Sequence, residues 1–168
     1  MIITKKEDLI SFKQYGYGWH KGFYHDDNIT ESLGKIKYTD FFDYPDDDDF
    51  PYDSAFYLLY GSCNHFALSL KNVFKYTPYI IEGNYSKGFH AFCQLYKAGT
   101  WYYIDARGIT SSFDEFMEIA KDFVMGEYTI RTVTSNDIEE WEKDSNYNKE
   151  AYAFSEAVIN KYKDYYTL

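Results

Sequence analysis

Apolar side chains in the middle of the chain recur at a helical spacing. From residue 63 to residue 75 they follow the i, i+3, i+4, i+7 pattern that places them on one face of an α-helix. The apolar positions are Cys63, Phe66, Ala67, Leu70 and Phe74. Ser62 stands immediately before this face and is a residue type that caps helices. The pattern therefore predicts a helix over Cys63–Lys75 with Ser62 as its N-cap.

Other helical segments are predicted by shorter patterns and by capping residues. Ser112 followed three residues later by Glu115 is a capping box, which predicts a helix through Phe123 that ends by Gly126. The remaining helical predictions are an amphipathic helix over Lys6–Gln14, a helical turn over Ser54–Tyr60 leading to Gly61, and a C-terminal helical region over Asn136–Tyr162 with a break near Asn146–Asn148.

Aromatic and β-branched residues are concentrated between the helices and predict strands. The predicted strands are Tyr79–Glu82, His90–Tyr96, Thr100–Asp105 and Glu127–Thr134. Helix, then strands, then helices is the order of an α+β fold with an antiparallel sheet. At 168 residues the chain has the length of one domain, so we predict a single domain over 1–168 with a core region of about 54–134.

The connection between the second and third strands determines which side chains share a face of the sheet. Ala98-Gly99 is a plausible two-residue turn, which would pair Lys97 with Thr100. In that register His90 and Asp105 are diagonal neighbours on one face, with backbones about 7–8 Å apart. A three-residue loop would instead put Asp105 on the opposite face.

Composition narrows the classes of function. The formal net charge is −10, which disfavours binding to phosphate backbones and suits either solubility or a basic protein partner. No stretch approaches the roughly 18 apolar residues of a membrane span, and the first residues lack the apolar core of a signal peptide. Only two cysteines occur, so a reducing cytoplasm is expected, while export without a cleaved signal stays open. The oligomeric state is not indicated.

Asp43–Asp53 contains two prolines and six aspartates. Clustered like charges and prolines predict an exposed loop. The segment lacks the alternating acidic ligands and central glycine of a calcium loop, so a solvated loop is the favoured interpretation.

Cys63 is the candidate nucleophile because of its place at a helix start. Unpaired amides and the positive end of the helix dipole favour a thiolate there and could also hold an oxyanion. Gly61 would let the chain turn sharply before it. A thiolate needs a proton acceptor and the acceptor needs an orienting group, which His90 and Asp105 could supply.

The other cysteine and histidines have structural interpretations. Strand parity points Cys93 away from His90, as a small core residue. His65 lies roughly 200° around the helix from Cys63 and is expected on the surface or in packing. Cys63, His65, His90 and Cys93 are zinc-type ligands, but their spacing and the strand parity disfavour a metal site. His20 and His25 lie in an aromatic segment and are expected to be structural.

The segments GSCNHFALSL, FHAF and WYYIDARG, in this order, resemble the transglutaminase-like and papain-like thiol enzymes. The resemblance covers about residues 57–110. Members place a cysteine at a helix start, a histidine on a following strand and an aspartate on the next strand. The superfamily contains peptidases, transglutaminases and bacterial effector-type glutamine deamidases. The resemblance implies that Cys63 is the nucleophile, His90 the general base and acid, and Asp105 the orienting carboxylate.

The chain departs from this family pattern at two points. The tryptophan that often follows the family histidine is Phe92 here, and Trp101 could take over its shielding role. The oxyanion side chain that papain-like enzymes carry before the cysteine is not evident, and Tyr57 or Tyr60 could serve. Asn64 and Gln94 are further candidates for lining the cleft.

Together these features predict a cysteine-nucleophile enzyme that acts on amide bonds of a protein or peptide through a thioester, without a cofactor. Peptidase, glutamine deamidase and transglutaminase chemistry stay open. The alternative is a non-enzymatic acidic protein that binds and inhibits a basic partner.

Overall fold

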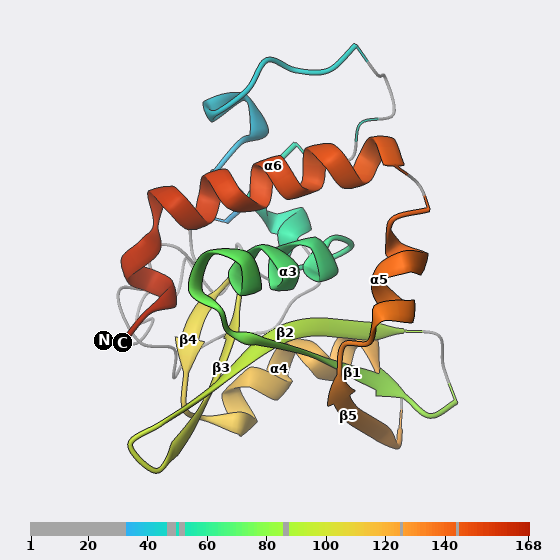
Figure 1. Cartoon of the computed structure of the whole chain (residues 1–168), viewed down its shortest axis with the longest axis vertical. Helices are drawn as coiled ribbons and strands as arrows, with labels where there is room; N and C mark the ends of the chain where they lie inside the picture. Colours follow the sequence, from blue (N-terminus) through green and yellow to red (C-terminus); the bar gives the residue numbers. More distant parts are fainter. Residues whose placement is uncertain (1–32, 47–49, 51–52, 86–87, 125, 144) are drawn as a thin grey trace.

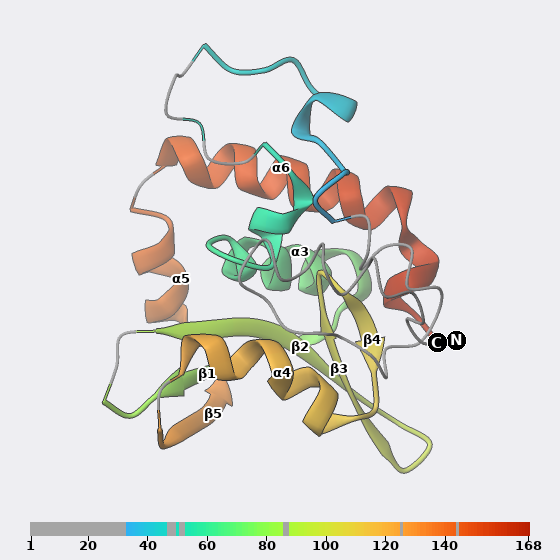
Figure 2. The same cartoon turned by 180° about the vertical axis from the view of Figure 1, so that it is seen from behind.

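The computed structural model describes residues 33–168 apart from 47–49, 51–52, 86–87, 125 and 144 (Figure 1). Within this part, helices α3 (Cys63–Phe74) and α6 (Ser145–Lys161) lie on one side of a sheet, and α4 (Phe113–Phe123) lies on the other (Figures 1 and 2). The fold is α+β, as predicted. The predicted helix over Lys6–Gln14, together with His20 and His25, falls outside the described residues.

The sheet has five antiparallel strands in the order β4-β3-β2-β1-β5. Their bounds are β1 Thr77–Gly83, β2 Phe89–Lys97, β3 Thr100–Asp105, β4 Gly108–Thr110 and β5 Tyr128–Thr132. The remaining helical elements are α5 (Ser135–Trp141) and the 3₁₀ turns η1 (Tyr38–Asp40), η2 (Ala55–Leu58) and η3 (Lys163–Tyr166). All four predicted strands are present, and β4 is an addition. With three residues it is too short to show a readable alternation, and all three are buried.

The β2–β3 hairpin has the predicted register. Lys97 pairs with Thr100, and Gln94 pairs with Tyr103. The two turn residues have left-handed backbones, with φ of 50° at Ala98 and 81° at Gly99. A two-residue turn of this type matches the twist of the flanking strands. His90 and Asp105 consequently lie on the same face of the sheet.

Helix α3 starts at Cys63 as predicted and is followed by Lys75, whose left-handed backbone (φ 64°) terminates it. Ser62 stands at the N-cap position, but its hydroxyl makes no capping hydrogen bond. Ser62 therefore occupies the predicted N-cap position, but the predicted capping hydrogen bond from its side chain is absent. Ser112, by contrast, caps α4 by accepting a hydrogen bond from the Glu115 amide at 3.3 Å.

The C-terminal helical region is divided earlier than predicted. Residues 146–148 lie inside α6, and the interruption falls between Trp141 and Ser145. Asparagines are weak helix formers, but the buried face of α6 packs on α3, and this tertiary contact overrides local propensity. Residues Ala151, Phe154, Val158 and Ile159 form that buried face.

The acidic segment Asp43–Asp53 is not a purely solvated loop. Its described residues form no helix or strand, and Tyr44 is exposed, as expected of a loop. Phe50, however, is only 5% exposed and packs edge-on against Tyr38 with ring centroids 4.7 Å apart. One aromatic side chain thus anchors the segment to the core.

Each face of the sheet carries its own apolar cluster. On one face, α3, α6 and the 3₁₀ turns pack on strand residues that include Ala91, Cys93 and Ile104. On the other face, Phe116 and Met117 of α4 pack on Ile81 and Phe92. The alternation of β2 side chains between these clusters follows from the period of two along a strand. In the described part of the chain, no helix combines the length and apolar character needed to cross a bilayer.

Candidate active site

Cys63 is the first residue of α3 and lies against the backbone of β2. Its side chain is 6% exposed, and the Ala91 amide donates a hydrogen bond to Sγ at 3.4 Å. Gly61 just before it has a φ of 101°, which allows the sharp entry into the helix that the sequence indicated. In the described part of the chain, a methyl group added at Gly61 would meet no atom within 4 Å, so none of the described residues closes this side of the helix start.

The first turn of α3 leaves backbone donors near the sulfur. Among the described residues, none accepts a hydrogen bond from the N–H of Cys63 or Asn64. Both amides belong to the positive end of the α3 dipole. Backbone N–H groups in this position can stabilise a negative charge on an oxygen that forms next to the sulfur.

His90 stands on β2 directly before Ala91 and is completely buried. Its Nε2 is 3.1 Å from Oδ2 of Asp105, the last residue of β3. Burial alone would lower the pKa of His90, but hydrogen bonds and charges from Asp105 and Cys63 outweigh it and raise the pKa to about 9. Since Nε2 is engaged by Asp105, Nδ1 is the nitrogen that can serve the sulfur.

Asp105 is held by more than His90. Arg107, which is 1% exposed, donates from Nη2 to Oδ2 at 2.6 Å and from Nε to Oδ1 at 3.0 Å. The Arg107 backbone amide also donates to Oδ1 at 2.9 Å. Burial would raise the pKa of Asp105, but the Arg107 charge and these hydrogen bonds hold it well below the ordinary range. The carboxylate is therefore ionised.

Aromatic rings cover the imidazole on the α4 side of the sheet. Phe92 stacks on His90 with centroids 6.4 Å apart, and Phe116 of α4 lies at 5.9 Å. Trp101 instead packs on Tyr96 and is 47% exposed. It stands four residues along β3 from Asp105, about 13 Å at strand spacing. The shielding role expected of Trp101 is thus filled by Phe116.

The remaining predicted cleft residues come from the segment before α3, from α3 itself and from β2. Tyr60 and Tyr57 precede the α3 start and are 50% and 38% exposed. Asn64 follows Cys63 and is buried. Gln94 is four residues along β2 from His90, so the structure does not bring it to the trio formed by Cys63, His90 and Asp105. Tyr57 and Tyr60 therefore carry exposed rings in the segment that leads into the helix start.

Cys93 and His65 have packing roles. Cys93 is a free thiol, fully buried, and donates to the Ala67 carbonyl at 3.2 Å, and burial raises its pKa well above the ordinary value. His65 is 5% exposed and packs edge-on against Tyr152 at 4.7 Å, so the packing interpretation holds and the surface one is wrong. Within the described ranges, no three His, Cys, Asp or Glu side chains are grouped as metal ligands.

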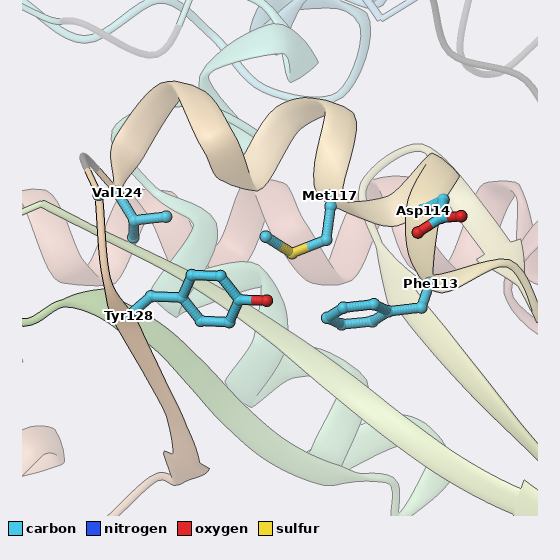
Figure 3. A pocket seen from close by; sticks show the side chains of 6 residues that line it. Phe113, Asp114, Met117, Val124 and Tyr128 are labelled. Carbon is cyan, nitrogen blue, oxygen red and sulfur yellow. The ribbon is translucent and has the colours of Figure 1, made fainter.

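A separate hollow of about 310 Å³ lies beside α4, away from the trio. Figure 3 shows the ring of Phe113, the thioether of Met117 and the hydroxyl of Tyr128 turned toward this space, with Asp114 at its margin. Cys63, His90 and Asp105 are not among the residues that line it.

Arg107 is the site residue that sequence reasoning did not assign. The run Ile104-Asp105-Ala106-Arg107 contains the signal, since a basic residue two positions after a strand-end carboxylate can turn back onto it.

No protein family, curated protein or solved structure matches the chain. The fold and site therefore define the protein as an α+β domain with a buried Cys-His-Asp cluster.

Proposed function

We propose that this protein is a cysteine-nucleophile enzyme that acts on amide bonds of a protein or peptide through a thioester intermediate. The observation that supports this most strongly is the convergence of three side chains from three elements. Cys63 comes from the start of α3, His90 from β2 and Asp105 from the end of β3. Each provides what the next needs: a nucleophile, a base and an orienting anion.

The Cys63 thiolate attacks the amide carbonyl carbon, and the carbonyl electrons move onto oxygen. The N–H groups of Cys63 and Asn64 stabilise this oxyanion. When the intermediate collapses, the C–N bond breaks and the imidazolium of His90 gives its proton to the leaving amine. Water or a second amine then attacks the thioester, His90 accepts the proton of that nucleophile, and the Cys63 thiolate is released.

Two features support a macromolecular substrate. The net charge of −10 attracts a basic protein or peptide. The exposed rings of Tyr57 and Tyr60 next to the helix start offer apolar contact to a chain that passes over Gly61. The family resemblance of residues 57–110 supports a papain-like or transglutaminase-like arrangement. The presence of only two cysteines, both free, supports a cytoplasmic location.

Selective alkylation tests the nucleophile. Cys93 is an internal control, because both thiols are free and nearly inaccessible. We expect iodoacetamide to modify Cys63 at least about tenfold faster than Cys93 at neutral pH, and His90→Gln to remove most of that difference. Equal, slow modification of both cysteines in the wild-type protein would contradict the proposal.

Activity is tested by incubation with candidate basic proteins and intact-mass analysis. Cleavage gives fragments, deamidation replaces –NH₂ by –OH, and transamidation joins a second amine. Cys63→Ala should abolish any such change and keep the fold, because its side chain is small and stands at a helix end. Cys93→Ala is the matched control and should keep activity. An effect that survives Cys63→Ala would instead indicate the non-enzymatic binding protein.

A further inference from the structure

Arg107 is a fully buried cation in a strongly acidic protein. It lies in the two-residue turn between β3 and β4, where Asp105 pairs with Gly108. Its side chain is among the largest that are completely removed from water. Burying a guanidinium is unfavourable unless its charge is paired and its N–H groups are bonded. Its contacts show that both conditions are met at the Asp105 carboxylate.

The two carboxylate oxygens are divided between Arg107 and His90. Oδ1 accepts from the Arg107 backbone amide and from Nε, at 2.9 and 3.0 Å. Oδ2 accepts from Nη2 at 2.6 Å and faces His90 Nε2 at 3.1 Å. Rotation of the carboxylate about its C–C bond would break several of these bonds together. One oxygen is thus kept at a constant place in front of the imidazole.

The guanidinium is itself anchored on α4. Nη2 donates to the Phe116 carbonyl at 3.1 Å, and the guanidinium carbon lies 5.7 Å from the centre of the Phe116 ring. The same ring lies against His90. Arg107 therefore connects the Asp105 carboxylate to α4 and to the Phe116 ring that lies against His90.

We propose that Arg107 is the positioning residue of the site: it clamps both oxygens of Asp105 so that an ionised carboxylate holds the Nε2–H tautomer of His90 with Nδ1 toward Cys63. This inference rests on the proposed function and adds a residue to it. Arg107 touches no substrate and acts through Asp105. An arginine suits this role better than a lysine, because its planar fork presents donors in fixed directions to both oxygens, whereas an ammonium group is a point charge with rotatable donors.

Charged and titratable groups around His90 are few in the described structure. Cys63 approaches from α3, Asp105 from β3 and Arg107 from the β3–β4 turn, while α4 presents Phe116. Tyr166 of η3 donates to the Ala106 carbonyl at 3.1 Å, and the Asp105 charge acts on its hydroxyl. Burial, above all, raises the pKa of Tyr166 well above its ordinary value, so it stays neutral.

Imidazole nitrogen NMR of the wild-type protein tests the tautomer directly. The His90 signals are assigned by their loss in His90→Gln. We expect a protonated Nε2 at every pH at which the fold persists, with protonation changes confined to Nδ1. A neutral His90 that carries its proton on Nδ1 would overturn the proposal. The measurement needs no substrate, so it is independent of whether the protein proves to be an enzyme.

Arg107→Lys and Arg107→Gln test the clamp, with Arg131→Gln as the matched control. Arg131 also bonds carboxylates, those of Glu82 and Asp137, but near β5 and away from the trio. We expect Arg107→Gln to slow Cys63 alkylation about 10- to 100-fold and to shift its pH profile, the scale of loss caused by misplacing a reacting group. Compared with Arg107→Gln, Arg107→Lys should regain part of the free energy of unfolding but little of the Cys63 alkylation rate. Arg131→Gln should leave the pH profile of Cys63 alkylation unchanged.

The outcomes separate the clamp from a merely structural role. A folded Arg107→Lys or Arg107→Gln protein with the wild-type pH profile and His90 tautomer would refute the clamp while leaving the proposed function intact. If Arg107→Gln does not fold, Arg107→Lys and the wild-type NMR measurement decide. If wild-type Cys63 shows no selective alkylation, the proposed function fails, and the His90 tautomer in Arg107→Gln then decides whether Arg107 positions the imidazole through Asp105.

Discussion

Three ionisable side chains of the site, those of His90, Asp105 and Arg107, have almost no contact with water. Such burial is unfavourable for isolated charges, and their mutual hydrogen bonds offset it. The pKa shifts follow from this balance. Asp105 stays ionised because Arg107 faces it, and an ionised Asp105 favours the protonated form of His90. The charge of Arg107 thus keeps Asp105 ionised, and the charge of Asp105 in turn favours the protonated form of His90.

The raised pKa of His90 makes stability depend on pH in a defined direction. In an unfolded chain the imidazole has a pKa of about 6.5, whereas in the folded protein it is about 9. A group whose pKa is higher in the folded protein than in the unfolded chain contributes its full stabilisation at pH values below the unfolded-chain pKa. That contribution is lost as the pH rises through the folded-protein pKa. We therefore expect the difference in unfolding free energy between wild type and His90→Gln to shrink as the pH is raised from about 6 to about 10.

Denaturant titrations at a series of pH values measure this difference. His65→Gln is the control, since it removes another buried imidazole from α3 while leaving the His90–Asp105 contact in place. A wild-type to His90→Gln difference that stays constant over this range would show that His90 is not held as a cation in the folded protein.

Elements place these residues by simple geometric rules. The even-length turn at Ala98-Gly99 keeps His90 and Asp105 on one face, and the start of α3 brings Cys63 to the β2 backbone at Ala91. The Ala91 side chain belongs to the α3-side cluster, whereas His90 contacts Phe116 on the α4 side. The sulfur thus meets the imidazole near the plane of the sheet, beyond the end of β3.

The hairpin turn offers a test of this register. Ala98 has a φ of 50°, which is unfavourable for alanine and is adopted more readily by asparagine. Asn-Gly is the preferred sequence for this turn. We expect Ala98→Asn to raise the free energy of unfolding by about 0.5 kcal/mol, in the range seen for substitutions that suit the native backbone.

Thermal unfolding measures this gain. Ala98→Val is the opposite control and is expected to lower the free energy of unfolding, because a β-branched residue is strongly disfavoured at a left-handed position. Neither change should alter Cys63 alkylation, because Ala98 lies eight residues from His90, about 26 Å at strand spacing. Destabilisation by Ala98→Asn would contradict the two-residue turn.

The predictable parts of the fold were those set by local patterns. The start of α3 at Cys63, the Ser112 cap and the parity of β2 and β3 are each specified by neighbouring residues. The division of the C-terminal helices was misplaced, because packing of α6 on α3 decided it. Of the site, the order Cys63, His90, Asp105 could be predicted, and the spacing of Asp105 and Arg107 carries a local signal. The contacts of Phe116 with His90 and Arg107 depend instead on how α4 packs on the sheet, which no local pattern encodes.

In the described part of the molecule, the site lies where three layers meet. Cys63 belongs to the α3–α6 layer, His90 and Asp105 to the sheet, and Phe116 to the α4 layer. The two apolar clusters on the faces of the sheet therefore differ in whether their large aromatic rings contact the imidazole and the guanidinium. The α4-side cluster includes the ring that contacts both His90 and Arg107, whereas Phe154, in the other cluster, packs on Tyr38 and Phe41.

This asymmetry separates stability from reactivity in a matched pair of variants. Phe116 and Phe154 are both completely buried, so Phe116→Leu and Phe154→Leu should each lower the free energy of unfolding by about 1–2 kcal/mol. Only Phe116→Leu removes the ring that covers the imidazole and supports the guanidinium. We therefore expect it alone to slow Cys63 alkylation, by about tenfold, which is less than the roughly 100-fold that a 1 Å misplacement can cause. Denaturant unfolding and alkylation rates, measured on the same samples, give both quantities. Equal slowing by the two variants would mean that general loosening of the fold, and not the α4 cover, governs the reactivity of Cys63.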